Sequence, residues 1–192
     1  MHNPEKYING DLCWRNEKGE LHREDGPAVI HPNGDCFWYK NGERHREGGP
    51  AIELANGEKE WWVDGKRHRE DGPALIKSNG DCFWYQNGKC HRENGPAIEY
   101  ENGRKKWYKN GKLHRENSPA FINTRGDCYW YKNGKRHREN GPAVEWADGY
   151  KEWWVDGEHH RIDGPAIERT NGSKEWWVNG KFVRREYNNA QT

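Results

Sequence analysis

The chain has 192 residues and a formal net charge of +1, because 32 basic residues nearly balance 31 acidic ones. The charges are interleaved along the chain, so we expect no basic surface for nucleic acid. No apolar run approaches the length of a membrane span or of a signal-peptide core. The 12 Trp and 9 Tyr residues predict a core that is aromatic rather than aliphatic.

The cysteines are odd in number, and no two of them are spaced as Cys-x-x-Cys. They are Cys13, Cys36, Cys82, Cys90 and Cys128. With no export signal in the sequence, we expect reduced thiols and a cytoplasmic protein.

A phrase close to His-Arg-Glu-Asp-Gly-Pro-Ala recurs every 23 residues. Its histidines stand at 22, 45, 68, 91, 114, 137 and 160, and a Trp keeps the same spacing at 38, 61, 84, 107, 130, 153 and 176. Such self-similarity indicates a repeat architecture, in which neighbouring repeats complete each other's core. We predict a single repeat domain over 1–192, with an N-terminal cap at 1–21, repeats at 22–180 and a C-terminal cap or tail at 181–192. Residues 1–10 and 181–192 are expected to be the weakest elements, with 188–192 frayed.

Residues 50–72 illustrate one repeat. Asn56-Gly57 and Asp64-Gly65 flank an aromatic stretch, and Asx-Gly between β-favouring segments predicts type I′ hairpin turns. Three strands are expected at about 51–55, 58–63 and 66–69. The Glu-Asp-Gly-Pro segment then reverses the chain, with Asp71 rather than Gly72 in the left-handed region. No segment has the 3.6-residue apolar period of a helix.

Two-residue turns would fix the strand register. Ile52 should then lie opposite Trp61, and Trp61 opposite His68. An aliphatic–Trp–His row of this kind recurs in six consecutive repeats and is the predicted core face.

The neighbouring row alternates between two kinds of repeat, so the full period is 46 residues. Repeats with Ile30, Ile76 and Ile122 should bury a second face, whereas those with Glu53, Glu99 and Glu145 should leave it in water. Either an odd number of strands per repeat or packing of successive repeats on opposite layers would cause the alternation. The predicted fold is all-β: an elongated antiparallel array of about seven 23-residue repeats, built as two layers or as a solenoid.

Seven His-Arg pairs could suggest catalysis or metal binding. A catalytic group is needed once, however, whereas a residue present in every repeat serves packing or hydrogen bonding, for example to backbone carbonyls beside the Gly-Pro turn. We interpret rows such as Glu53, Glu60 and Arg69 as a solvated ladder of offset charges rather than an acid–base pair. Motifs for phosphate loops, nucleophile elbows and zinc proteases are absent from the sequence. We therefore expect no catalytic residue, no metal site, no cofactor and no enzyme activity.

Four aromatic residues are candidates for a binding surface, because they lie on the charged face opposite the predicted core Trp. Exposed aromatic residues flanked by charge are typical of recognition surfaces. Alternatively, neighbouring repeats or Lys and Arg stems cover them. The four residues are Trp62, Tyr108, Trp154 and Trp177.

The tracts 38–42, 107–112 and 130–135, which read Trp-Tyr-Lys-Asn-Gly with a following Lys in the last two, resemble MORN-type repeats in their variant form. The likeness covers roughly 7–180, although the His-Arg-Glu-x-Gly-Pro-Ala half departs from the ordinary MORN pattern. The resemblance implies a β-repeat scaffold with protein partners, self-association or sometimes a membrane surface, and no catalytic residues.

The Trp-Trp-Val-Asp-Gly tract at 61–65 is similar to the aromatic hairpins of cell-wall-binding repeats, which hold choline or glucan between repeats. Our preferred expectation is a non-catalytic scaffold or protein–protein interaction module, with a protein partner or a homodimer. The alternative is a choline- or sugar-binding module that uses Trp pockets between repeats. We do not expect a membrane surface or nucleic acid as a partner.

Overall fold

The computed structural model describes residues 3–188, and within that range the protein is all-β. Every pair of neighbouring strands is antiparallel, and the same hairpins recur from repeat to repeat, which confirms the predicted class. Residues 3–188 contain no helix long and apolar enough to cross a membrane. Of the C-terminal tail predicted to fray, 189–192 lie outside the described residues.

The chain divides into two compact units, with the boundary between Arg92 and Glu93. Each unit contains a main sheet, to which every repeat adds two short strands. In the first unit these strands, in order across the sheet, are β1 (Glu5–Lys6), β2 (Leu12–Cys13), β3 (Val29–Ile30), β4 (Cys36–Phe37), β7 (Ile52–Glu53), β8 (Lys59–Glu60), β11 (Leu75–Ile76) and β12 (Cys82–Phe83). In the second unit they are β15 (Ile98–Glu99), β16 (Lys105–Lys106), β19 (Phe121–Ile122), β20 (Cys128–Tyr129), β23 (Val144–Glu145), β24 (Lys151–Glu152), β27 (Ile167–Glu168), β28 (Lys174–Val178) and β29 (Lys181–Glu186).

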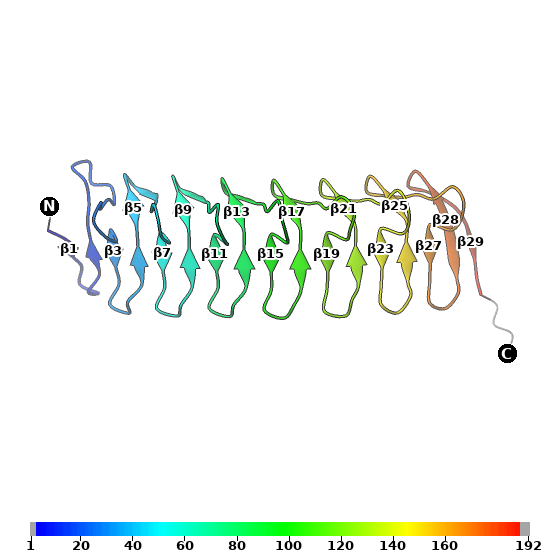
Figure 1. Ribbon diagram of the computed structural model, residues 1–192, viewed down its shortest axis with the longest axis horizontal. Helices are drawn as coiled ribbons and strands as arrows, with labels where there is room; N and C mark the ends of the chain where they lie inside the picture. The colour runs from blue at the N-terminus through cyan, green and yellow to red at the C-terminus, as the bar shows by residue number, and fades with distance from the viewer. Residues whose placement is uncertain (1–2, 189–192) are drawn as a thin grey trace. The chain divides into compact units, whose positions relative to one another are not determined.

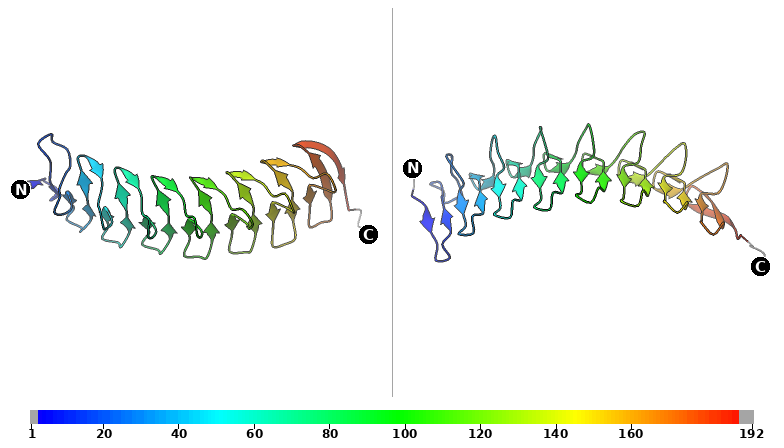
Figure 2. Two further views of the ribbon diagram at one scale, coloured as in Figure 1. Left: turned by 45° about the horizontal axis from the view of Figure 1, so that its top comes forward. Right: turned by 60° about the horizontal axis from the view of Figure 1, so that its bottom comes forward.

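Between consecutive pairs of main-sheet strands, the chain forms a second, two-stranded hairpin. These hairpins make a separate row in each unit, above the main sheet in Figure 1 and beside it in Figure 2. In the first unit they are β5 (Tyr39–Lys40) with β6 (Glu43–Arg44), β9 (Trp62–Val63) with β10 (Lys66–Arg67), and β13 (Tyr85–Gln86) with β14 (Lys89–Cys90). In the second they are β17 (Tyr108–Lys109) with β18 (Lys112–Leu113), β21 (Tyr131–Lys132) with β22 (Lys135–Arg136), and β25 (Trp154–Val155) with β26 (Glu158–His159).

The hairpin turn at Asp64-Gly65 is the type I′ turn that the sequence predicts. Asp64 and Gly65 both have positive φ, at 47° and 68°, and Val63 pairs with Lys66 across the turn. The turns of the other five two-stranded hairpins, and the turn between β28 and β29, likewise have an Asn or Asp with positive φ before the glycine. Local turn chemistry therefore decides this half of the repeat.

The turn at Asn56-Gly57 is not type I′, and that prediction is wrong. Only Gly57 has positive φ, at 90°, and its N–H donates to the Leu54 carbonyl at 2.9 Å, while the Leu54 N–H donates to Glu58. The loop thus has three residues, a type I turn followed by a left-handed glycine. The Asn56 side chain accepts a hydrogen bond from the Glu58 N–H, which stabilises this geometry.

The extra loop residue shifts the register of the main sheet by one position. Ile52 pairs with Glu60 rather than with Trp61, so the predicted core row is wrong on that side, whereas the His68 N–H does bond the Trp61 carbonyl. A shift of one residue exchanges the two faces of a strand. The face turned inward in the first unit carries Cys13, Val29, Phe37, Ile52, Glu60, Leu75 and Phe83.

The explanation of the 46-residue period by an odd strand number is also wrong. Each of the six repeats from β3 to β26 contributes four strands, two to the main sheet and two to a hairpin, and successive repeats extend the same sheet within a unit. The predicted contrast in burial is not observed either, because Ile30 and Glu53 are both half-buried. The inward row alternates instead, from Phe37 to Glu60 to Phe83 in the first unit.

Candidate functional site

The arginine of the repeated His-Arg phrase stacks on the Trp of its own repeat. In the seven His-Arg phrases the guanidinium carbon lies 3.9–4.1 Å from the ring centroid, and Arg184, which follows Val183, stacks on Trp176 at 3.5 Å. Arg46 also donates through Nη1 to the Pro50 carbonyl at 2.9 Å, and the equivalent bond occurs in five more repeats. This confirms that the arginines satisfy backbone carbonyls beside the Gly-Pro turn, with a cation–π contact added.

The stacked arginine explains the glycine of the Glu-x-Gly-Pro segment. A Cβ on Gly72 would lie 2.8 Å from the Arg69 Cζ, so a larger residue would push against the end of the stacked side chain, although Ser118 occupies the equivalent position beside Arg115. The prediction that Asp71 is left-handed is wrong, because its φ is not positive. Asp71 instead accepts a hydrogen bond from the Arg69 Nε at 2.9 Å.

The histidine links each repeat to the next. The Nδ1 of His22 accepts a hydrogen bond from the backbone N–H of Asn41, which is the first left-handed residue of the following turn, at 3.1 Å. Five further histidines make the same contact 19 residues ahead, at 3.1–3.2 Å. A donor in a strained turn is thereby satisfied, and the histidine is a structural element of the repeat.

Buried carboxylates lie on the inward face of the main sheet, where the sequence analysis placed a solvated ladder. That interpretation is wrong for Glu60, which is 8% exposed. Its Oε2 accepts hydrogen bonds from the Trp62 Nε1 at 2.7 Å and from the Arg67 Nε at 2.9 Å. Burial is tolerated because both donors offset the loss of water.

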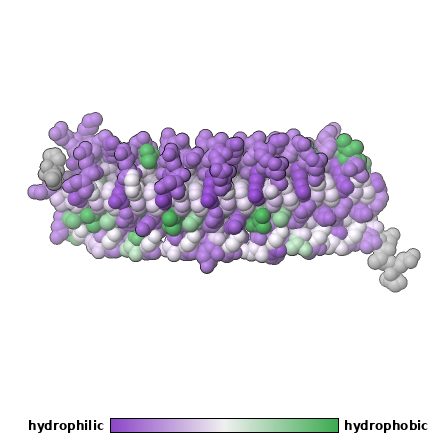
Figure 3. Space-filling model, in the orientation of Figure 1, coloured by the Kyte–Doolittle hydropathy of each residue, from purple (hydrophilic) through white to green (hydrophobic). Residues whose placement is uncertain are grey.

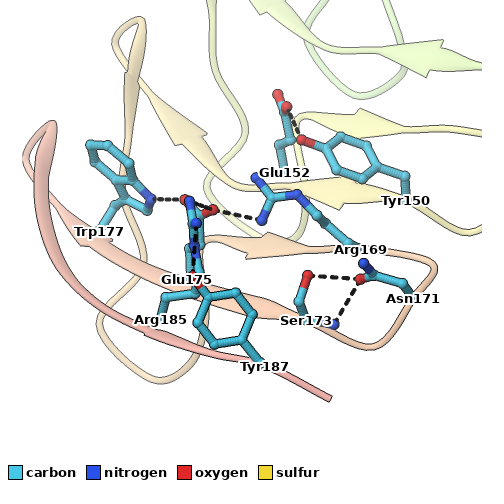
Figure 4. A network of polar contacts seen from close by, with 9 residues as sticks. All are labelled: Tyr150, Glu152, Arg169, Asn171, Ser173, Glu175, Trp177, Arg185 and Tyr187. Atoms are coloured by element: carbon cyan, nitrogen blue, oxygen red, sulfur yellow. Dashed lines mark hydrogen bonds and ion pairs between the residues drawn. The ribbon is translucent and has the colours of Figure 1, made fainter. Parts of the chain in front are cut away.

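In the second unit, two further glutamates lie in the same row (Figure 4). Glu152 accepts hydrogen bonds from the Tyr150 hydroxyl at 2.5 Å and from the Trp154 Nε1 at 2.6 Å, and the His159 Nε2 lies 3.7 Å away. Burial opposes ionisation, but these three groups outweigh it and lower the pKa of Glu152 to about 2. Burial and the contact with Glu152 raise the pKa of Tyr150.

Glu175, 2% exposed, is enclosed by three donors. Its oxygens accept from the Trp177 Nε1 at 2.9 Å and from Arg169 and Arg185 at 2.6 Å each. Burial raises its pKa, but the three donors prevail and hold the pKa below its usual value. Glu152 and Glu175 are therefore ionised acceptors rather than proton donors at neutral pH.

The four predicted binding aromatics are all half-buried. The Nε1 groups of Trp62, Trp154 and Trp177 donate to the glutamate two residues earlier. Trp154 and Trp177 are brought together by the ring of His159, at 3.7 and 5.5 Å between centroids. Trp62 lies in the other unit, and Tyr108 pairs with Leu113 in its hairpin.

The sequence itself carries a signal for the buried carboxylates. Glu at the inward position is always followed two residues later by Trp, at 60 and 62, 152 and 154, and 175 and 177. Where the inward residue is Phe37, Phe83, Lys106 or Tyr129, the later residue is Tyr. Only the indole supplies an N–H for a carboxylate at that distance, so the two positions vary together.

Grooves separate the His-Arg-Glu segments of neighbouring repeats. One groove in the second unit has a volume of about 340 Å³ and lies between 115–117 and 137–140, with Trp130 and Lys132 in its wall. Its counterpart in the first unit, about 610 Å³, lies between 22–27 and 45–47. Hydrophilic residues gather over the hairpins, and small apolar patches lie over the main sheet (Figure 3).

Within residues 3–188, no three His, Cys, Asp or Glu side chains are arranged to hold a metal ion. The five cysteines form no disulfide bond, and burial raises the pKa of Cys36 and Cys128. No protein-family model matches the chain, and a search of curated proteins found no match.

Proposed function

We propose that the protein is a non-catalytic repeat scaffold that binds other proteins through the grooves and charged loops between its repeats. The observation that carries this proposal is the use of the repeated polar residues. His22 and its copies bond turns of the next repeat, and Arg46 and its copies cover Trp rings. The repeated His and Arg side chains are thus used within the fold, and the exposed side chains of the repeats are available to contact a partner protein.

The exposed surface offers charged side chains at a regular spacing. In the first unit the glutamates of three successive His-Arg-Glu segments, Glu24, Glu47 and Glu70, have side chains 86–89% exposed. Two main-sheet strands per repeat place neighbouring copies roughly 10 Å apart, since adjacent strands are about 4.8 Å apart. An extended polypeptide advances about 3.3 Å per residue, so every third side chain would meet an equivalent position.

Small-ligand binding in Trp pockets is the weaker candidate. A choline-type cation would stack on an indole face, but the Arg46 guanidinium already lies 3.9 Å above Trp38. The three indole N–H groups that could bond a sugar donate to glutamates. We place the protein in the cytoplasm, in keeping with five cysteines that form no disulfide bond. The MORN-type resemblance points to the same class of scaffold.

Affinity capture from the native cell tests the proposed function. The full chain should retain proteins that bind it saturably when purified, and lysine at Glu24 and Glu47 should weaken that binding without changing the circular dichroism. A matched pair of lysines at Glu43 and Glu58, which do not line the grooves of the first unit, should leave binding unchanged. If choline or an oligosaccharide changed the Trp fluorescence saturably and no protein bound, the small-ligand function would replace the scaffold.

A further inference from the structure

The stacked arginines have carboxylate partners that follow a rule. In one kind of repeat the partner is an Asp two residues later: Arg23 with Asp25 and Arg69 with Asp71, each at 2.9 Å. In the other kind it is a Glu seven residues later: Arg46 with Glu53 at 2.7 Å, Arg138 with Glu145 at 3.0 Å. Arg161 has both, Asp163 at 3.1 Å and Glu168 at 3.2 Å.

Arg115 breaks the rule. The position two residues later is Asn117, and the position seven residues later is Ile122. Among the described residues, 3–188, no carboxylate lies within ion-pair distance of its guanidinium. Arg115 still stacks on Trp107 at 4.0 Å and donates to the Pro119 carbonyl at 3.3 Å, so its side chain is held in place without a counter-ion. Burial lowers the pKa of Arg115, as expected for an uncompensated cation.

The unpaired guanidinium lines the groove of about 340 Å³ in the second unit. The two glutamates of that groove lie beside other side chains: Glu116 accepts from the His114 Nε2 at 2.9 Å, and Glu139 lies 3.9 Å from the Nζ of Lys132 in the groove wall. The amides of Asn117 and Asn140 also line the groove. A pre-positioned cation and neutral donors therefore face an open space.

We propose that the groove beside Arg115 binds the carboxylate of an acidic side chain from a partner polypeptide, in the place that Asp25 and Asp71 occupy beside Arg23 and Arg69. This inference rests on the proposed protein-binding function and names the chemistry of one contact. In the paired repeats the Nε of the stacked arginine donates to the Asp at 2.9 Å, and an acidic side chain in the groove would accept the corresponding bond from Arg115. An Asp or Glu of an extended segment lying along the groove would complete the missing ion pair.

The test is a titration of the full chain, observed at the arginine Nε–H resonances by NMR. The probes are the capped peptide Gly-Asp-Gly-Asp-Gly, its Asn counterpart, and inorganic phosphate. The Asp peptide should shift the Arg115 resonance saturably, with little change at Arg69 or Arg138, whose carboxylates are already in place. The Asn peptide should bind at least tenfold more weakly.

Matched variants distinguish specific binding at Arg115 from a nonspecific effect of the net charge of the groove. Asn117→Asp supplies the internal partner found in other repeats and should weaken peptide binding at least tenfold. Asn140→Asp adds the same charge to the same groove, beside an arginine that already has Glu145, and should weaken binding less than threefold. Conversely, Glu145→Ile removes the carboxylate partner of Arg138, as in the Arg115 repeat. The Asp peptide should then also shift the Nε–H resonance of Arg138.

The proposal is overturned if the Asp peptide does not shift the Arg115 resonance, or if Asn140→Asp weakens peptide binding as much as Asn117→Asp does. It is also overturned if the peptide does not shift the Arg138 resonance in the Glu145→Ile variant. Tighter binding of inorganic phosphate than of the Asp peptide would overturn the assignment to a polypeptide and indicate a phosphate site. Since the titration needs no native partner, these results are independent of the capture experiment. A chain that captures proteins equally well after Asn117→Asp would retain the scaffold function and lose this contact.

Discussion

The hydrogen bond between Glu60 and Trp62 should contribute measurably to the free energy of unfolding. The variant Trp62→Tyr removes the indole N–H that bonds the Glu60 carboxylate at 2.7 Å. Losing a hydrogen bond to a buried charged group costs about 1.5–3 kcal/mol. Glu60→Phe should also destabilise the protein, by about 1–3 kcal/mol, because it leaves Arg67 without its acceptor.

The double variant should be more stable than the sum of its parts. Glu60→Phe with Trp62→Tyr reproduces the Phe-Trp-Tyr tract of 37–39, in which Tyr39 accepts from Arg44 at 3.4 Å. We expect a favourable coupling of about 1.5–3 kcal/mol between the two changes. Urea unfolding followed by far-ultraviolet circular dichroism measures it, and an unchanged m-value is the control for the denatured state. Effects that add within about 0.5 kcal/mol would refute the assignment of Trp62 to the buried carboxylate.

Three further predictions concern the other contacts of the repeat. Gly72→Ala should cost about 1–3 kcal/mol because its Cβ meets the stacked arginine at 2.8 Å, while Ser118→Ala, at the equivalent position, should change urea stability by less than about 0.5 kcal/mol. The lowered pKa of Glu152 should stabilise the fold fully above the ordinary value of 4.5. About 3 kcal/mol should be lost as pH falls from there to about 2; Glu152→Gln should flatten that part of the urea-stability profile, and an unaltered profile would contradict the pairing. His22→Phe should cost about 1–2 kcal/mol and speed hydrogen exchange at the Asn41 amide, which loses its acceptor; unchanged protection would exclude that role.

Much of the fold could be predicted because its causes are local. The 23-residue period, the absence of helix in the described chain and the type I′ turn at Asp64-Gly65 depend on residues close together in sequence. The turn at Asn56-Gly57 shows the limit of that reasoning. The same kind of dipeptide adopts a three-residue loop there, and the competing geometries differ by one residue in register.

The candidate site was harder to predict than the fold. Trp62 was expected on a charged, exposed face, but it lies half-buried with its N–H on Glu60. Arg115 could have been found from the sequence, since it alone lacks an acid at both the second and seventh following positions. That the missing acid leaves Arg115 without an ion pair follows only from the structure, in which the other arginines bond the acids at those positions.

The sequence by itself determined that the protein is a β-repeat array of a given period, because spacing and turn chemistry act over a few residues. Only the tertiary structure decided which side chains face inward, since a one-residue change in loop length exchanges the two faces of every main-sheet strand. That exchange places Glu60 rather than Trp61 opposite Ile52. It is also why a charged row became part of the interior, where each carboxylate requires its own donors.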